Sequence, residues 1–156
     1  MSYQSEAQLE DNLIKQLVNQ GFNKVKISDE ELEFITGISD EPKALEFLLQ
    51  GDVEVIIYTK GTNGAEFITK ERKVFSPSFR VQAQDTTGAG DSFIGSFLYQ
   101  VAEDDNTLES LVNLSEEKIK EILTFSNATA ALTVCKRGAI GALPTKEEVL
   151  ALAQGR

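Results

Sequence analysis

Residues 85–91, DTTGAGD, decide the fold, and a helix is predicted to follow them from Ser92 to about Glu103. In this stretch two glycines flank an alanine, so backbone N–H groups can converge on one point without obstruction by side chains. The N-terminus of the following helix adds the positive end of its dipole. Together these features predict an anion hole that holds the charge on a transferred phosphoryl group.

Two carboxylates flank this predicted anion hole. Asp91 stands where the helix opens, and a carboxylate there can accept the proton of a hydroxyl that attacks phosphorus. Asp85 begins the turn and can help to bind a cation. The same residues also suit an ordinary helix start, because Asp and Thr cap helices and glycine-rich turns are common. A dinucleotide fingerprint is excluded, since Phe93 stands where its third glycine belongs, and no Walker loop occurs in the sequence.

Strands and helices alternate on both sides of this turn, which predicts a layered α/β fold in a single domain spanning residues 1–156. The apolar run at 53–59, VEVIIYT, is typical of a strand covered on both faces, as in a parallel sheet. Few strands look central, so part of a sheet is expected to be missing. The predicted helices cover residues 6–20, 28–37, 41–50, 92–103, 108–113, 116–135 and 146–153, and the predicted strands or extended runs cover residues 22–27, 53–59, 65–69, 73–76 and 79–83.

Composition excludes several classes of function. The net charge of −10 argues against nucleic acid as a partner, because a phosphate-backbone surface needs clustered Lys and Arg. The chain has no histidine, which excludes Ser-His-Asp and Cys-His mechanisms and removes the commonest zinc ligand. The single Cys135 cannot form an internal disulfide and is expected to be a small buried residue on a helix. Neither a signal peptide nor a membrane span is apparent, so a cytoplasmic location is predicted.

Four segments together resemble the PfkB/ribokinase-like carbohydrate kinases. They are DTTGAGDSF (85–93), KISDEELEFITG (26–37), YTKGTNGA (58–65) and SNATAALTVCKRGAIGALPT (126–145), and they occur in the family's order and at about its spacing. The resemblance covers nearly the whole chain from about residue 20. It implies a three-layer αβα ribokinase-like fold, of which this chain is the C-terminal portion with a partial, mainly parallel sheet.

The resemblance also implies a role for particular residues. In the family the aspartate that ends the GAGD turn is the general base for the sugar hydroxyl, and the residues before it supply the anion hole. A second segment lies along the ATP phosphates, and an asparagine that opens a helix flanks the adenine. The matching positions are Asp91 for the base; Gly88, Ala89 and Gly90 for the anion hole; Asp85 and the Thr87 carbonyl for a monovalent cation, usually K⁺, with backbone around residues 136–139; Thr59, Gly61 and Gly64 for the phosphates; and Asn127 for the adenine.

Three positions leave alternatives open. Lys60 stands where many relatives carry an apolar residue, and its charge either assists the phosphates or is simply solvated. The family's N-x-x-E motif, which organises Mg²⁺ through water, occurs as Ser28 to Glu31, a variant that resembles bacterial fructokinases. Ser28 and Glu31 would equally form a capping box with a purely structural role. Ser96 replaces a usual Gly or Ala and is expected to affect helix packing.

The resemblance further implies that the N-terminal sugar-binding half and the lid of the family fold are absent. The parent enzyme is expected to be fructokinase-like, with ATP and a small sugar as substrates and Mg²⁺ and K⁺ as cofactors, while the isolated chain is expected to be inactive. Ribokinase, adenosine kinase and keto-deoxy-gluconate kinase relatives remain alternatives, as does a non-catalytic nucleotide-binding or structural fragment. The face left by the missing half is expected to cause self-association.

Overall fold

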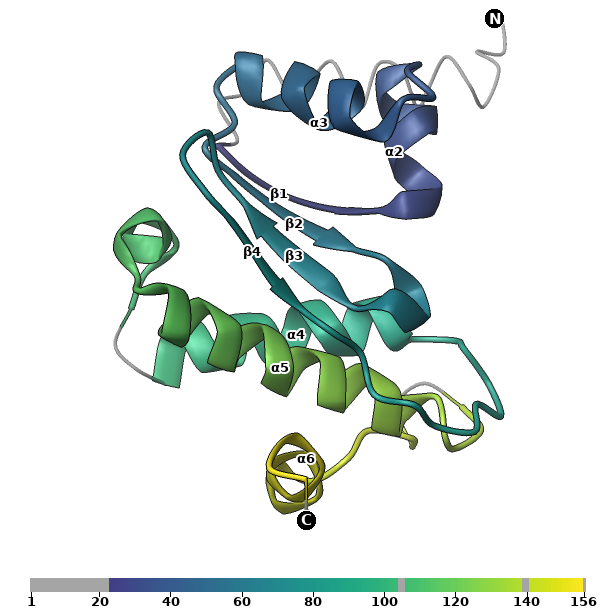
Figure 1. Cartoon of the computed structure of the whole chain (residues 1–156). Coiled ribbons are helices and arrows are strands. Elements are labelled where there is room, and N and C mark those ends of the chain that lie inside the picture. Colours follow the sequence, from purple (N-terminus) through teal and green to yellow (C-terminus); the bar gives the residue numbers. More distant parts are fainter. Residues whose placement is uncertain (1–22, 104–105, 139–140, 156) are drawn as a thin grey trace, which may run out of the picture.

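The computed structural model describes residues 23–103, 106–138 and 141–155. A four-stranded sheet lies between two layers of helices, with a further helix outside the lower layer (Figure 1). The strands are β1 (Lys24–Ser28), β2 (Val55–Thr59), β3 (Ala65–Ile68) and β4 (Lys73–Ser76), the α-helices are α2 (Asp29–Thr36), α3 (Glu41–Gln50), α4 (Ala89–Glu103), α5 (Glu116–Thr133) and α6 (Lys146–Ala153), and short 3₁₀ turns span Gly61–Asn63 and Leu108–Asn113.

The sheet is mixed, so the prediction of a mainly parallel sheet was wrong for the described strands. Its order is β1-β2-β3-β4, with β1 parallel to β2 and with β3 antiparallel to both of its neighbours. The reason lies in the connections. The chain between β1 and β2 carries α2 and α3, as a crossover between parallel strands requires, whereas β2, β3 and β4 follow one another through short turns.

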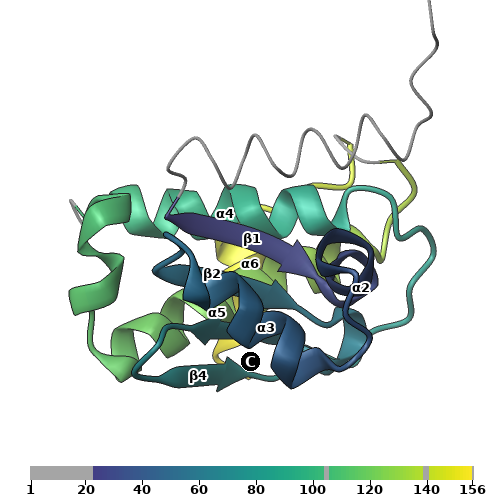
Figure 2. The ribbon, with the colours of Figure 1, turned by 90° about the horizontal axis from the view of Figure 1, so that it is seen from above.

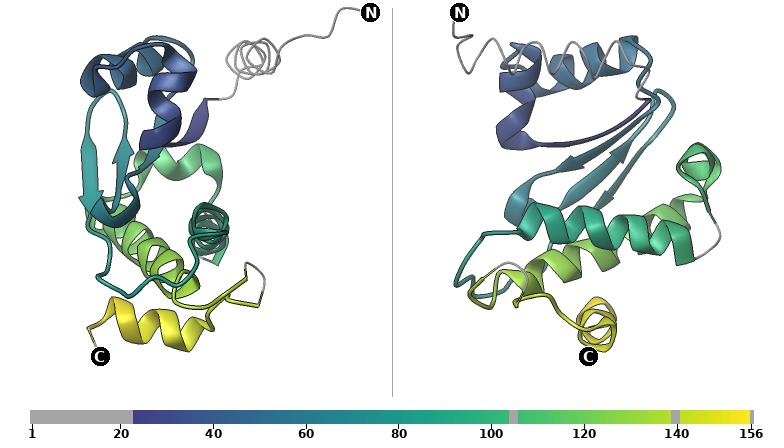
Figure 3. Two further views of the ribbon diagram at one scale, coloured as in Figure 1. Left: turned by 90° about the vertical axis from the view of Figure 1, so that its right-hand side faces the viewer. Right: turned by 180° about the vertical axis from the view of Figure 1, so that it is seen from behind.

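The alternation of side chains along β2 explains the three layers. Val55 and Ile57 face α4 and α5, and Ile56 and Tyr58 face α2 and α3. Because successive side chains of a strand point to opposite faces, one apolar strand supplies both cores. Side views show the sheet between the two helical layers (Figure 3), and a view from above shows α4 on the β1 side of the sheet with α5 toward β4 (Figure 2). The predicted three-layer α/β arrangement is therefore confirmed.

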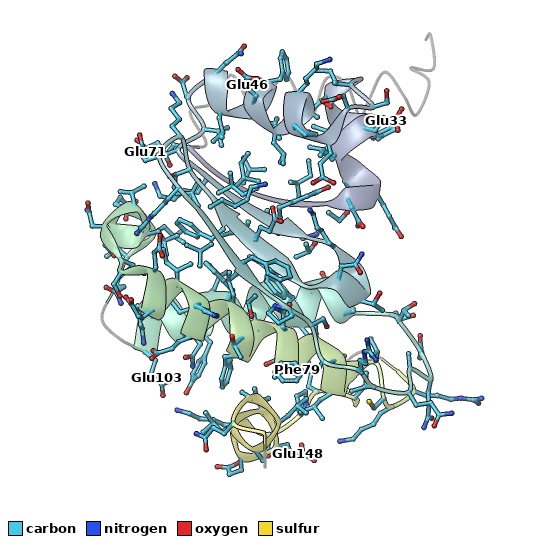
Figure 4. All side chains as sticks on the ribbon, viewed as in Figure 1. Glu33, Glu46, Glu71, Phe79, Glu103 and Glu148 are labelled. Carbon is cyan, nitrogen blue, oxygen red and sulfur yellow. The ribbon has the colours of Figure 1, made fainter. Side chains whose placement is uncertain are left out.

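Most predicted boundaries agree with the structure to within two residues, with two exceptions that matter for the site. Helix α4 begins at Ala89 rather than at Ser92, so the last three residues of the GAGD motif lie in its first turn. Residues 79–83 form no strand, and Phe79 packs instead against a cluster of Phe125, Ala128 and Val149 between α5 and α6 (Figure 4).

Three smaller points complete the comparison. The helix predicted at 6–20 lies outside the described residues. Cys135 lies just beyond the end of α5 and is partly exposed, so the prediction of a buried helical residue was wrong. In the part of the chain that the structure describes, no helix combines the length and the apolarity needed to cross a bilayer.

Candidate active site

The first turn of α4 leaves backbone donors open. The first hydrogen bond of the helix runs from the Ser92 amide to the Gly88 carbonyl at 2.8 Å. The amides of Gly90 and Asp91 therefore have no acceptor within the helix, as at any helix N-terminus. Ala89, which was expected to contribute an open amide, instead donates to the Thr86 carbonyl at 3.3 Å. Gly88 has a φ of +82°, a left-handed conformation that favours glycine and lets the chain turn into the helix.

The Asp91 carboxylate lies beside these donors and is exposed. It makes no hydrogen bond or ion pair with any other residue that the structure describes. Together with Gly88 it lines a cavity of about 510 Å³ that extends along α4 past Tyr99 toward Leu143 and Val149. An accessible carboxylate next to two open amides can accept a proton while the amides hold an anion.

Asp85 clamps this turn to the segment that follows α5. Its Oδ1 accepts the Thr87 amide at 3.0 Å, and its Oδ2 accepts the Gly138 amide at 3.2 Å. The N–H of Thr87, followed by the Thr87 side chain and then the N–H of Gly138, holds the pKa of Asp85 below its usual value, so the carboxylate is ionised. The structure thus brings together the two segments predicted to share a cation. Because both carboxylate oxygens already accept amides, carbonyl oxygens such as that of Thr87 are the better candidates for ligands of a monovalent cation.

Glu31 closes a capping box at the start of α2. Its Oε2 accepts the amide and the hydroxyl of Ser28, each at 2.7 Å, and lies 3.3 Å from Lys26 Nζ. Partial burial acts to raise the pKa of Glu31, but the Ser28 hydrogen bonds and the Lys26 charge outweigh it and lower the pKa. Among the described residues no three carboxylates form a direct metal site. Glu31 is therefore an ionised, half-exposed carboxylate that closes the capping box of α2 and pairs with Lys26.

Lys26 is a residue of this site that the sequence analysis missed. It lies on the face of β1 that also carries Lys24, opposite to the face of Ile27. Its ammonium would lie 3.9 Å from a Cβ atom built on Gly90, which places it beside the first turn of α4. The available signal was the spacing in KIS, since Lys26 precedes Ser28 by two residues at the end of a strand.

The turn after β2 is closed by its own backbone. The Lys60 amide donates to the Gly64 carbonyl at 2.8 Å, and the Asn63 amide donates to the Lys60 carbonyl at 2.9 Å. Gly61 and Gly64 both have positive φ, at +50° and +111°. A Cβ atom on Gly64 would overlap the Ser76 carbonyl oxygen and lie 2.8 Å from the Pro77 Cα. Glycine is thus required at position 64 by packing, whatever the turn binds.

Lys60 is not simply solvated, as one of its two predicted alternatives had it, and the other alternative, assistance to the phosphates, stays a prediction. Its Nζ pairs with Glu41 Oε1 at 2.8 Å and with Glu66 Oε1 at 3.2 Å, and its side chain is 20% exposed. Partial burial alone would lower the pKa of Lys60, but the hydrogen bonds and charges of Glu41 and Glu66 raise it. The ammonium therefore ties the turn to α3 and β3.

Asn127 lies in the interior of α5 and does not open a helix, so that expectation was wrong. It is only 4% exposed, and its Nδ2 donates to the carbonyls of Ser76 at 3.0 Å and Pro77 at 3.2 Å. Gly64 packs closely against the same two residues. Asn127 therefore supports the Gly64 turn through the segment that leaves β4.

These elements converge at one end of the sheet (Figure 1). The carboxyl ends of β1 and β2 lie there, followed by α2 and by the turn beginning at Thr59, and the N-terminus of α4 lies at the same end. Ligands of α/β proteins bind at the carboxyl ends of parallel strands, where loops and helix N-termini gather. The fold and the position of the site are those of an α/β protein with a ribokinase-like arrangement.

The comparison with known proteins makes the family definite. Residues 3–146 match the pfkB family of carbohydrate kinases, and the chain belongs to that family. It is 42% identical over 128 residues to the probable fructokinase-2 of Arabidopsis thaliana, and 42% identical over 123 residues to fructokinase-2 of Zea mays. These matches cover 81% and 78% of this chain but only 37% and 35% of the relatives, so the chain spans little more than a third of their length.

Solved structures of carbohydrate kinases share the fold of this chain. The fructokinase of Xylella fastidiosa with bound ATP superposes with a TM-score of 0.84 at 30% identity, covering 98% of this chain and 48% of that one. The fructokinase of Vibrio cholerae, in a form with fructose, ADP and calcium bound, gives a TM-score of 0.71 at 28% identity, covering 88% of this chain and 44% of that one. The resemblance to PfkB sugar kinases that the four motifs indicated is confirmed.

Proposed function

We propose that this chain carries the ATP site and the catalytic base of a sugar kinase that transfers the γ-phosphoryl group of ATP to a hydroxyl of a fructose-like sugar. The observation that carries the proposal is the first turn of α4, where the exposed Asp91 carboxylate stands next to the open amides of Gly90 and Asp91. This is the pairing of a base with an anion hole that phosphoryl transfer needs.

The transfer proceeds by in-line displacement at phosphorus. The sugar hydroxyl oxygen forms a bond to the γ-phosphorus while the bond to the β,γ-bridging oxygen breaks and ADP leaves. Asp91 accepts the hydroxyl proton, and the open amides of α4 hold the negative charge of the phosphoryl oxygens. Because this helix also contributes its dipole, the charge is stabilised without reorganisation of the site.

The remaining site residues hold the nucleotide and the cations. Thr59, Gly61 and Gly64 shape the turn along which the phosphates lie, with Lys60 and Asn127 acting as its internal supports. Mg²⁺, when bound, neutralises phosphate charge, and Glu31 would hold it through water. K⁺ would lie by the Asp85 clamp and the Thr87 carbonyl, where it would fix the geometry of the turn.

Fructose is the favoured sugar because the similar curated relatives named above are fructokinases. Ribokinase of Thermotoga maritima, at 28% identity, and aminoimidazole riboside kinase of Salmonella enterica, also at 28%, share the fold as well. A ribose-type or nucleoside substrate is therefore the second candidate. Residues that select the sugar are expected in the part of the relatives that this chain does not match.

The experiment measures ATP turnover with Mg²⁺ and K⁺ across fructose, ribose and adenosine, together with ATP binding. In the full-length parent, Asp91→Asn is expected to lower kcat by about 10³-fold while the KM for ATP changes little, because the base acts only in the chemical step. An unchanged kcat would overturn the assignment of Asp91. This chain alone is expected to bind ATP without turnover, since it does not position an acceptor hydroxyl. Sugar-dependent turnover by the chain alone would overturn that expectation.

We also propose that the chain associates with itself through the β1 side of the sheet. Among the described strands β1 pairs only with β2, and α4, which lies on that side of the sheet, carries the exposed Leu98. An unpaired strand edge next to exposed apolar side chains favours association. Light scattering at high concentration is expected to show a mass above that of the monomer, and a monodisperse monomer would refute the proposal.

A further inference from the structure

We propose that Glu41 and Glu66 are positioning residues, which hold the Lys60 ammonium and thereby keep the turn at residues 60–64 in the conformation that binds ATP. The inference rests on the proposed function and deepens it, since it concerns how the turn is ordered before binding. It is carried by the ion pairs of Lys60 Nζ with Glu41 Oε1 at 2.8 Å and with Glu66 Oε1 at 3.2 Å. Both carboxylates lie outside the four segments that resemble carbohydrate kinases.

Lys60 shapes the turn with its backbone and anchors it with its side chain. Its amide donates to the Gly64 carbonyl at 2.8 Å, and its carbonyl accepts the Asn63 amide at 2.9 Å. Its side chain passes over the Tyr58 ring, whose centre lies 5.0 Å from the ammonium. One residue therefore carries both the hydrogen bonds that close the turn and the contacts that tie the turn to the rest of the fold.

The two carboxylates lie in the helical layer opposite to α4. Glu41 is the first residue of α3, and Glu66 pairs with Tyr58 in the antiparallel register of β2 and β3. Because Tyr58 faces α2 and α3, Glu66 points to the same layer. Helix α4, which carries Asp91, covers the other face of the sheet. The ion pairs therefore act on the turn from the α3 side of the sheet, away from the proposed base.

The charges of this network compensate one another. Glu66 is 8% exposed, and its second oxygen lies 3.1 Å from Lys73 Nζ. The hydrogen bond from Lys60 outweighs partial burial and holds the pKa of Glu41 below its usual value, so this carboxylate is ionised. Two of the three N–H donors of the Lys60 ammonium are used by Glu41 and Glu66. Loss of either carboxylate would therefore loosen the anchor of the turn.

A turn that is ordered before binding favours affinity. Ordering a loop during binding costs conformational entropy, and the apparent affinity falls with the fraction of molecules in the binding conformation. Glu41→Gln should therefore weaken ATP binding although Glu41 touches no part of the nucleotide. A direct contact between Lys60 and the phosphates predicts the opposite sign, because Glu41→Gln would then free the ammonium and remove a negative charge.

The test combines amide NMR titrations of this chain with Mg·ATP and hydrogen exchange of the Lys60 and Asn63 amides, and the spectra show that each variant is folded. Glu41→Gln is expected to weaken ATP binding about threefold and Lys60→Met about tenfold, with faster exchange of both amides in each variant. The double variant should bind no more weakly than Lys60→Met, because both changes break the same contact. Lys60→Arg should restore most of the affinity, since it keeps the charge.

Glu46→Gln is the matched control, because Glu46 also lies on α3 and is exposed (Figure 4). It removes the same charge and is expected to change neither the exchange of the turn nor the affinity for ATP. The inference is wrong, while the proposed function stands, if Glu41→Gln leaves ATP binding unchanged or makes it tighter, or if Glu46→Gln weakens binding equally. If the unmodified chain does not bind Mg·ATP, the proposed nucleotide site and this inference are both overturned.

Discussion

In the turn at residues 60–64 backbone groups hydrogen-bond to one another, whereas in the turn at residues 85–91 two backbone amides have no acceptor within the helix that follows. Both turns carry two glycines and follow an extended segment. In the first, the Lys60 amide and the Gly64 carbonyl bond to each other, and Gly64 packs directly against Ser76 and Pro77. In the second, the amides of Gly90 and Asp91 have no acceptor within the helix that they begin.

The difference shows that a glycine in a functional turn can be present for two separate reasons. Gly64 is required by steric contact and by a φ of +111°. Gly90 has an ordinary helical backbone, and a Cβ there would meet only the Lys26 ammonium, at 3.9 Å. At Gly64 a side chain would damage the fold, whereas at Gly90 it would fit the fold and would affect only the ligand that we propose for this turn. Substituting each glycine by alanine separates the two reasons.

The largest effect is expected for Gly64→Ala. The new methyl group would overlap the Ser76 carbonyl, and the positive φ adds backbone strain. We expect the free energy of unfolding to fall by about 3 kcal/mol or more, as for other substitutions that overpack a rigid backbone contact. Urea unfolding followed by far-UV circular dichroism measures this change.

Gly61→Ala is the control for Gly64→Ala within the same turn. Gly61 also has a positive φ, of +50°, but a Cβ there would meet nothing within 4 Å. Gly61→Ala should therefore lower the free energy of unfolding through backbone strain alone, by about 1 kcal/mol. Equal losses at the two positions would show that strain, and not the contact with Ser76, dictates glycine at position 64.

A smaller and opposite effect on stability is expected for Gly90→Ala. Alanine restricts the unfolded chain and suits a helix, so the free energy of unfolding should rise by about 0.5 kcal/mol. ATP binding should nevertheless weaken about tenfold, because the methyl group would stand on the first turn of α4, whose open amides are proposed to hold the phosphate. Urea unfolding and an NMR titration with Mg·ATP measure the two quantities. If Gly90→Ala lowered the free energy of unfolding as much as Gly64→Ala, glycine would be required by the fold in both turns, and the proposed difference between them would be wrong.

Much of the fold could be predicted from sequence because its signals are local. The apolar run at 53–59 marks the strand that is buried on both faces, and Ser28 with Glu31 marks the capped start of α2. The direction of strand pairing was not predicted correctly, since it depends on which connections are long enough for a crossover. The start of α4 was placed three residues late, because two glycines in GAGD lower the helix propensity of its first turn.

Site residues that belong to a sequence motif could be predicted. The contacts that they make with residues far away in the sequence were harder to predict, because these depend on the fold. Asp85 and Gly138 are 53 residues apart, and their contact was expected only from the family resemblance. The partners of Lys60, Glu41 and Glu66, come from two other elements, and no local pattern connects them to the turn. Lys26 was missed although its spacing before Ser28 marks its face of β1, because its position beside α4 follows from strand direction and the layering of the fold.

The smallest effect expected is the pH dependence of the Asp85 clamp, which holds the open turn in place. The folded-state pKa of Asp85 is lowered by the amides of Thr87 and Gly138, so its contribution to stability is present above the ordinary value of 3.8 and is lost as the pH falls through the lowered pKa. Asp85→Asn should therefore unfold at lower urea concentration than the unmodified chain at pH 6, and the two midpoints should converge below pH 3.8. Asp52→Asn, in the exposed turn after α3, controls for the removal of one negative charge. A midpoint difference for Asp85→Asn that is the same at every pH would mean that the carboxylate acts through its shape and not through its charge.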